Sequence, residues 1–176
     1  MPVTDPQTEL FDVIDEQDRV IGQTTRYKAH RDPSLLHRSI GILVFRGDEV
    51  FLQKRSATKD TLPGLWTCSV TGHVDSGEDW LHAAKRELHE EIGIEADSDP
   101  VQIHQSILRY SYESELMRFY RYDIDANAIL KLDANEIAEG KWFTVDQTFL
   151  TDQLPAMGIT PCMKLIAETY LSRLIG

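Results

Sequence analysis

Apolar runs of strand length, separated by turn residues, occupy much of the chain. The strongest of them, from His37 to Phe45, is followed by a turn at Arg46-Gly47-Asp48 and then by a second apolar run. The same reading predicts strands at 10–14, 20–25, 37–45, 50–53, 67–74, 102–112, 115–124 and 140–144. A short turn joins the first two, so they are expected to form a hairpin.

In two segments the apolar residues recur at helical spacing instead. Between Gly77 and Gly93 they lie three or four positions apart, which predicts an amphipathic helix over 78–91. Its apolar positions are Leu81, Ala84, Leu88 and Ile92. A second helix is predicted at 160–174. Strands in the middle of the chain, one inserted helix and one terminal helix together predict an α/β fold with a mixed sheet packed between helices.

The length of 176 residues fits one domain, expected at 9–176 after a flexible lead at 1–8. The acidic N-terminal segment lacks a secretory pattern, and no apolar run reaches membrane-spanning length. A cytoplasmic protein without membrane contacts is therefore expected. Its two cysteines, Cys68 and Cys162, are expected to be free, packed thiols.

The net charge of −11 argues against non-specific binding to nucleic acid, whose phosphates require a basic patch. It does not exclude a small phosphorylated substrate. A divalent cation held by carboxylates can bridge an acidic protein and an anionic ligand. The charge therefore favours a small molecule over a nucleic acid as the partner.

The predicted helix over 78–91 carries an unusual group of acidic residues. Glu87, Glu90 and Glu91 are spaced i, i+3, i+4, so their carboxylates emerge on one face and repel one another. Either a water-exposed surface or a bound cation relieves that repulsion. Spacing alone leaves both interpretations open.

The wider pattern around these residues decides between them. It reads G-x5-E-x7-R-E-U-x-E-E-x-G-U, where U is a bulky aliphatic residue, and every position is matched. The matching residues are Gly72, Glu78, Arg86, Glu87, Leu88, Glu90, Glu91, Gly93 and Ile94. Chance would produce the seven fixed identities about once in 10⁸–10⁹ windows. The segment is therefore identified as a Nudix box.

Resemblance to the Nudix family implies an α/β/α sandwich with a mixed sheet and a metal site at a strand–loop–helix junction. By that resemblance, Glu87, Glu90, Glu91 and the carbonyl of Gly72 bind Mg²⁺ or Mn²⁺. Arg86 would orient the carboxylates, and Glu78 would brace the loop. Hard divalent cations do prefer such oxygen ligands.

Nearly the whole chain, from about residue 11 to 170, is similar to one branch of the family, the type 1 isopentenyl-diphosphate isomerases. The similar segments are RYKAH at 26–30, HRS at 37–39, QKRSATK at 53–59, LPGLWT at 62–67, GH at 72–73, YESE at 112–115 and NEIAEGKW at 135–142. The resemblance implies a second divalent-metal cluster at His30, His37, His73, Glu113 and Glu115. It also implies that Arg26, Arg55 and Lys59 bind the substrate diphosphate.

Three departures from the isomerases concern the chemistry. The isomerases place a proton-transferring cysteine directly before the GH pair, where this chain has Thr71. Cys162 stands where they have a carbocation-stabilising aromatic residue. Cys68 lies three positions before Thr71 and is expected on the opposite face of a strand. The isomerases, in contrast, lack box carboxylates that this chain retains at Glu87 and Glu90.

An alcohol is a poor proton shuttle at neutral pH, so the residues favour hydrolysis of a diphosphate linkage over allylic isomerisation. The expected catalytic residues are Glu87, Glu90, Glu91, Arg86 and Glu115, with the general base unassigned among the carboxylates. The substrate is expected to be a nucleotide or organic diphosphate, and the protein a monomer or homodimer. Isopentenyl-diphosphate isomerase is the first alternative, and a non-catalytic sensor of phosphorylated metabolites is the second.

Overall fold

The computed structural model describes residues 5–175. Its strands are β1 (Leu10–Ile14), β2 (Val20–Thr25), β3 (Leu36–Arg46), β4 (Glu49–Arg55), β5 (Trp66–Thr67), β6 (Val70–His73), β7 (Val101–Arg109), β8 (Ser114–Asp123) and β9 (Ile137–Thr144). Its helices are α1 (Arg26–Ala29), α2 (Trp80–Ile92), α3 (Leu154–Ala156), α4 (Pro161–Ile166) and α5 (Ser172–Leu174). Two π-helical segments, Phe149–Gln153 and Ala167–Leu171, precede α3 and α5. Within these residues no helix combines the length and the apolar character needed to span a bilayer.

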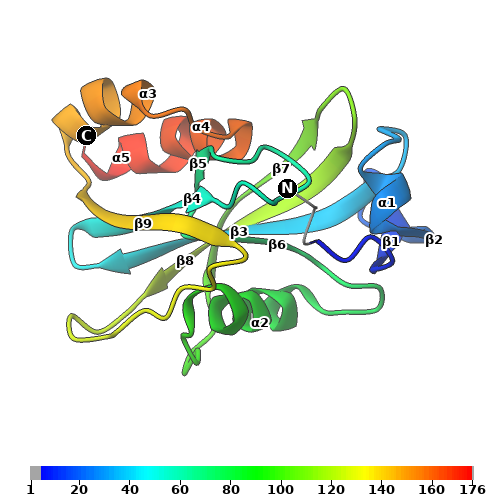
Figure 1. Cartoon of the computed structure of the whole chain (residues 1–176), viewed down its shortest axis with the longest axis horizontal. Helices are drawn as coiled ribbons and strands as arrows, with labels where there is room; N and C mark the ends of the chain where they lie inside the picture. The colour runs from blue at the N-terminus through cyan, green and yellow to red at the C-terminus, as the bar shows by residue number, and fades with distance from the viewer. Residues whose placement is uncertain (1–4, 176) are drawn as a thin grey trace.

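The main sheet is mixed, with the strand order β5-β4-β3-β8-β7. β3 pairs with β8 in parallel along ten residues and with β4 and β6 antiparallel, while β9 pairs with β4. In Figure 1, α2 covers one face of the sheet, and α3, α4 and α5 cover the other. The predicted α/β/α sandwich is therefore confirmed.

A hydrophobic core fills the space on each side of the sheet. Beneath α2, the side chains of Ala84, Leu88 and Ile92 are fully buried against β3 residues such as Ile40. On the other face, residues of the C-terminal helices pack on β3, β4 and β8. Helical periodicity predicted the buried face of α2 because that stripe must be removed from water.

The boundaries of α2 follow from its capping residues. Asp79 accepts hydrogen bonds from the N–H groups of Leu81 at 2.9 Å and His82 at 3.3 Å, so the helix begins one residue later. Gly93 ends it in the left-handed conformation with φ of 70°. The predicted start at Glu78 was therefore two residues early.

The predicted strand at 67–74 is instead two short strands. At Cys68 and Ser69 the chain leaves its pairing with β4 and begins to pair with β3. The Ser69 hydroxyl accepts the Val44 N–H at 2.7 Å and donates to the Phe51 carbonyl, so it replaces strand contacts where β3 and β4 separate. Polar and small apolar residues alternate through the whole segment, TCSVTGHV, so the sequence pattern gave no sign of this change of partner.

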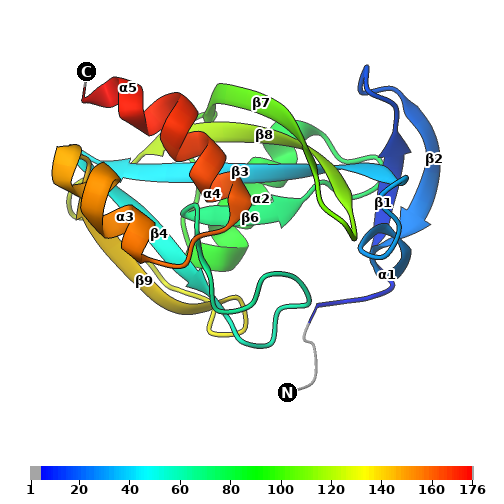
Figure 2. The ribbon, with the colours of Figure 1, turned by 90° about the horizontal axis from the view of Figure 1, so that it is seen from above.

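Two helical regions also differ from prediction. The predicted helix at 160–174 is continuous, capped by Thr160, but its middle turns at Ala167–Leu171 are π-helical. α1 and the helical segment at Phe149–Ala156 were not predicted. Figure 2 shows α1 beside the β1–β2 hairpin at one end of β3. α1 is important because it leads directly to His30.

Of the predicted flexible lead at 1–8, residues 1–4 lie outside the described part of the chain. Asp5 is described, and its side chain is buried. Backbone hydrogen bonds from Tyr27 to Gln7 and from Arg26 to Glu9 join the following residues to α1. The domain boundary at residue 9 stays a prediction.

Candidate active site and metal centre

A cavity of about 460 Å³ lies where β3, β6 and α2 meet the loop that follows β4. Among the described residues, nine carboxylates line it against four lysine and arginine residues. Once ionised, these carboxylates would repel a phosphorylated ligand, unless cations are bound together with it. The charge of the cavity therefore fits a site that works with divalent metal.

Arg86 organises the box residues around this cavity. Its guanidinium binds both Glu78 oxygens, at 2.9 and 2.8 Å, and donates to the His73 carbonyl at 3.0 Å. Its remaining nitrogen donates to Glu87 at 2.7 Å and to Glu90 at 3.1 Å. One side chain thus joins the loop, β6 and α2, and its role in orienting metal ligands stays a prediction.

Gly72 is required because Glu87 takes the space of a side chain there. A Cβ added at Gly72 would lie 2.1 Å from both Cδ and Oε1 of Glu87. Glu87 therefore packs directly across the backbone of β6. From the sequence, a glycine was expected at this position because its backbone approaches the ion. The structure adds a second reason, the packing of Glu87 against it.

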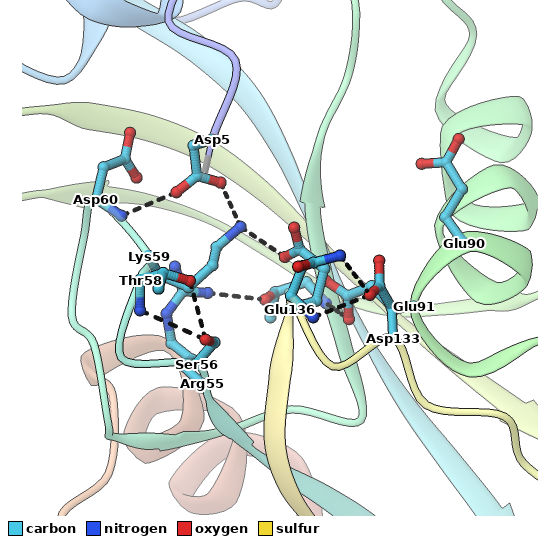
Figure 3. A network of polar contacts seen from close by, with 12 residues as sticks. Asp5, Arg55, Ser56, Thr58, Lys59, Asp60, Glu90, Glu91, Asp133 and Glu136 are labelled. Atoms are coloured by element: carbon cyan, nitrogen blue, oxygen red, sulfur yellow. Dashed lines mark hydrogen bonds and ion pairs between the residues drawn. The ribbon is translucent and has the colours of Figure 1, made fainter. Parts of the chain in front are cut away.

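Glu91 and Glu90 occupy different environments. Glu91 is buried, and it accepts hydrogen bonds from the Gln53 amide at 2.5 Å and the Thr71 N–H at 3.3 Å. The Glu90 side chain is 54% exposed, and Figure 3 shows it on α2 pointing away from Glu91. Helical spacing thus placed the carboxylates on adjoining surfaces without predicting their different burial.

Burial dominates the electrostatics of the box. It raises the pKa of Glu87 to about 8, although Arg86 acts in the opposite direction. Burial and then the charge of Glu87 raise the pKa of Glu91 well above its ordinary value. Burial would also raise the pKa of Glu78, but hydrogen bonds from Arg86, the Asp75 N–H and His82, together with the charge of Arg86, outweigh it and lower that pKa to about 2. Glu87 and Glu91 are therefore costly to ionise without a cation, which fits metal ligands.

The stability of the metal-free protein should fall as pH rises from about 6.5 to 8. The raised pKa of Glu87, about 8 against 4.5, means that the folded state binds more protons there. That stabilising contribution is complete below pH 4.5 and lost as pH passes 8. The lowered pKa of His37, about 4 against 6.5, acts only below this window.

Mg²⁺ requires ionised carboxylates, so its stabilising effect should grow over the same window. Melting temperatures measured with EDTA and with excess Mg²⁺ at several pH values test this. A difference between the two series that does not change with pH would contradict it.

A second cluster is built by the strand register. β3 and β8 pair in parallel with His37 opposite Glu115, and β3 and β6 pair with Ser39 opposite His73. Glu113 and Glu115 lie two residues apart, so both point to the same side. His30 arrives from the end of α1.

Four of the five predicted residues bring a ligand atom within 4.8 Å of the others: His30, His37, His73 and Glu113. His30 Nε2 lies 3.2 Å from His73 Nε2 and 3.3 Å from a Glu113 oxygen. Glu115 is adjacent, with an oxygen 3.5 Å from His73 Nε2. Among the described residues, the ligand atoms of this group lie within 4.8 Å of one another, whereas those of the box carboxylates are not gathered so closely.

The donor atoms of this cluster are prepared for a metal. His37 Nδ1 donates to the Leu35 carbonyl at 3.1 Å, and the buried Nε2 on the other side of the ring has no hydrogen-bond partner. Burial lowers the pKa of His37 to about 4 and that of His73 well below its ordinary value, so both rings are neutral. Neutral imidazole with an oriented outer nitrogen is the form that binds divalent ions. The residues present therefore fit the implied second metal.

The three predicted phosphate-binding cations all line the cavity. Arg55 donates to the Thr61 carbonyl and to the Thr71 hydroxyl, at 3.1 and 3.3 Å. Arg26 and Lys59, in contrast, are paired with carboxylates. Their role in binding substrate stays a prediction.

Two residues of the site, Glu136 and Asp60, were not predicted from the sequence. Glu136 lines the cavity and pairs with Lys59 at 2.5 Å, and its charge contributes to the raised pKa values of Glu87 and Glu91. Asp60 binds His30 Nδ1 at 3.1 Å and Arg26 at 2.9 Å. Glu136 lies within the segment at 135–142 that is similar to the isomerases, and this similarity could have indicated that it belongs to the site. Asp60 carried no such signal.

Two of the three residues weighed against the isomerases, Thr71 and Cys162, lie at the cavity. Thr71 faces the cavity and Cys162 lines it, whereas Cys68 is fully buried outside its lining. Both cysteines are free thiols, as predicted. Hydrogen bonding lowers the pKa of Cys162 to about 7.

Comparison with known proteins is consistent with this architecture. The NUDIX domain model matches residues 35–159. Isopentenyl-diphosphate Delta-isomerase 2 of Photorhabdus laumondii is 33% identical over 76% of this chain and 76% of its own. Isopentenyl-diphosphate Delta-isomerase II of Camptotheca acuminata is 29% identical over 90% of this chain. The match spans only 60% of that longer protein.

Among solved structures, DR0079 from Deinococcus radiodurans superposes with a TM-score of 0.73 at 23% identity, covering 92% of this chain and 99% of that one. The MutT protein from Methanosarcina mazei gives 0.64 at 20% identity, covering 81% and 96%. These likenesses concern the fold. The family model, the complete box and the isomerase relatives together show that this chain belongs to the Nudix family.

Proposed function

We propose that this protein is a Mg²⁺-dependent hydrolase of a diphosphate linkage in a nucleotide or organic diphosphate. The observation that carries the proposal is the complete set of box carboxylates on one cavity, with Glu87 and Glu90 fixed by Arg86 and Glu91 held by Gln53. Thr71, which stands where the isomerases have a cysteine, donates its N–H to Glu91 and accepts from Arg55 through its hydroxyl.

The residues would divide the work in the following way. Glu87, Glu90, Glu91 and the Gly72 carbonyl would hold the divalent ion, which when bound neutralises the diphosphate and activates water. Arg86, which donates to Glu87, would keep the carboxylates oriented, and Arg55, which lines the cavity, would donate to a phosphate oxygen. One of these carboxylates, or Glu115, would take a proton from the attacking water.

One set of observations favours isomerisation of isopentenyl diphosphate as a second candidate. Relatives carrying that name are 25–33% identical, and four of the five residues of the histidine cluster converge. Cys162 also places a thiol on the cavity wall, although not at the position before Gly72. An isomerase would need one group that donates a proton and another that accepts one. The Thr71 hydroxyl is a poor proton donor or acceptor at neutral pH.

A parallel assay separates the two reactions. Purified protein with Mg²⁺ or Mn²⁺ should release phosphate from members of a panel of nucleoside and isoprenoid diphosphates, and EDTA should abolish release. The same samples in deuterated water should show no exchange into isopentenyl diphosphate. Exchange without hydrolysis would replace the hydrolase by the isomerase. Binding without either reaction would indicate a sensor.

A further inference from the structure

The N-terminal segment places a carboxylate among the cations of the cavity. Asp5 receives hydrogen bonds from Lys59 and, at 2.8 Å, from the Asp60 N–H, and its Oδ1 lies 3.2 Å from Arg26 Nη2. All three side chains, those of Asp5, Lys59 and Arg26, are at most 8% exposed. Figure 3 shows Lys59 between Asp5 and Glu136.

These donors form a complete receptor for an anion. An ammonium group, a guanidinium nitrogen and a backbone N–H converge on one carboxylate, which is the combination that binds phosphate oxygens in proteins. Both Asp5 and the adjoining Pro6 line the cavity wall. The Asp5 carboxylate therefore stands in the place of a ligand anion.

The attachment of the segment allows Asp5 to move without unfolding the domain. From Gln7 onward the backbone is fixed, because Tyr27 donates to the Gln7 carbonyl at 3.1 Å and Arg26 to that of Glu9 at 2.8 Å. Asp5 lies beyond this anchor. It is held through its carboxylate and through one hydrogen bond from the Gln7 side-chain amide to its carbonyl, at 3.2 Å. Arg26 would keep Asp60 and Glu9, and Lys59 would keep Glu136, after Asp5 departs.

We propose that Asp5 is a specificity-determining residue, an internal anion that a phosphate group of the substrate must displace from Lys59, Arg26 and the Asp60 N–H. Ligands with a terminal phosphate or diphosphate can compete for these donors, and those without one cannot open the site. The proposal rests on the proposed function only in taking the ligand to be a diphosphate. It does not depend on turnover.

The test measures equilibrium binding of methylenediphosphonate, a diphosphate analogue that cannot be hydrolysed, in the presence of Mg²⁺. Asp5→Asn weakens the internal competitor, so the Kd should fall about fivefold. Asp99→Asn is the matched control, since it removes a surface carboxylate paired with Lys85 at 2.6 Å, and its Kd should not change.

Hydrogen exchange on the unmodified protein provides a second readout that needs no variant to fold. Saturation with the analogue should speed exchange of the Asp60 N–H, which loses its acceptor when Asp5 leaves, unless the analogue itself takes that bond. Exchange of the Glu9 N–H, which donates to the carbonyl of Pro6 next to Asp5 at 3.0 Å, should rise in either case.

The outcomes separate this inference from the hydrolase proposal. Tighter binding by Asp5→Asn, or binding by that variant alone, supports displacement whether or not any substrate is hydrolysed. Equal or weaker binding by the variant, unchanged exchange at Glu9, or no binding to either protein overturns it. Hydrolase activity is judged independently by the turnover assay.

Discussion

Glu91→Gln should reduce Mg²⁺-dependent hydrolysis about 10³-fold while leaving the protein folded. The substitution removes a proposed metal ligand and proton acceptor, but the shape of the side chain and the hydrogen bond from Gln53 can be kept. Because burial raises the pKa of Glu91, a neutral amide also removes a charge that the metal-free protein tolerates poorly. Its melting temperature in EDTA should therefore equal or exceed that of the unmodified protein, by a margin that grows with pH.

Glu95→Gln is a suitable control, since the Glu95 side chain is 85% exposed and contacts only His89 among the ion pairs of the described residues. Its activity and stability should be unchanged. Steady-state kinetics with circular dichroism and thermal melts distinguishes a lost catalytic group from a lost fold. Retention of more than a tenth of the activity by Glu91→Gln would contradict the assigned role.

Gly72→Ala should lower kcat/KM about 100-fold, whereas the protein should stay folded. The added methyl would lie 2.1 Å from the Glu87 carboxyl, so this side chain must leave the position in which Arg86 holds it. A displaced flexible end costs about 1–3 kcal/mol, less than a backbone clash. Mg²⁺ affinity, measured by calorimetry, should fall in parallel with kcat/KM.

Gly22→Ala provides the comparison. A Cβ at Gly22 meets its nearest neighbour, the Val13 Cβ, at an ordinary 4.0 Å. Both activity and Mg²⁺ affinity should persist in this variant. Full activity in Gly72→Ala would mean that the position of Glu87 is not needed for turnover.

What could be predicted from the sequence depended on how far apart the interacting residues lie. The box is contiguous, so its strand–loop–helix arrangement and the role of Arg86 followed from spacing and resemblance. The histidine cluster combines α1, β3, β6 and the residues before β8, and only family resemblance brought these together in advance. Parallel pairing of β3 with β8 supplies the physical cause.

The Lys59 network shows where sequence reasoning ended. Lys59 contacts Asp5 and Glu136, which lie 54 and 77 positions away, and none of the three belongs to a periodic pattern. Composition indicated an acidic protein without indicating that the carboxylates occupy the cavity cations. Similarly, the change of strand partner at Ser69 depends on where β3 and β4 separate, which no local pattern records.

Two adjacent residues of β6 belong to the two candidate metal sites. The Gly72 carbonyl is a proposed ligand of the box metal, and the His73 ring belongs to the histidine cluster. One peptide unit is therefore common to both. An ion that shifts this unit on binding at one site alters the geometry offered at the other, and thermodynamic linkage requires the effect to be equal in both directions. The two ions would then load cooperatively or antagonistically, and the order of addition would not change the final occupancy.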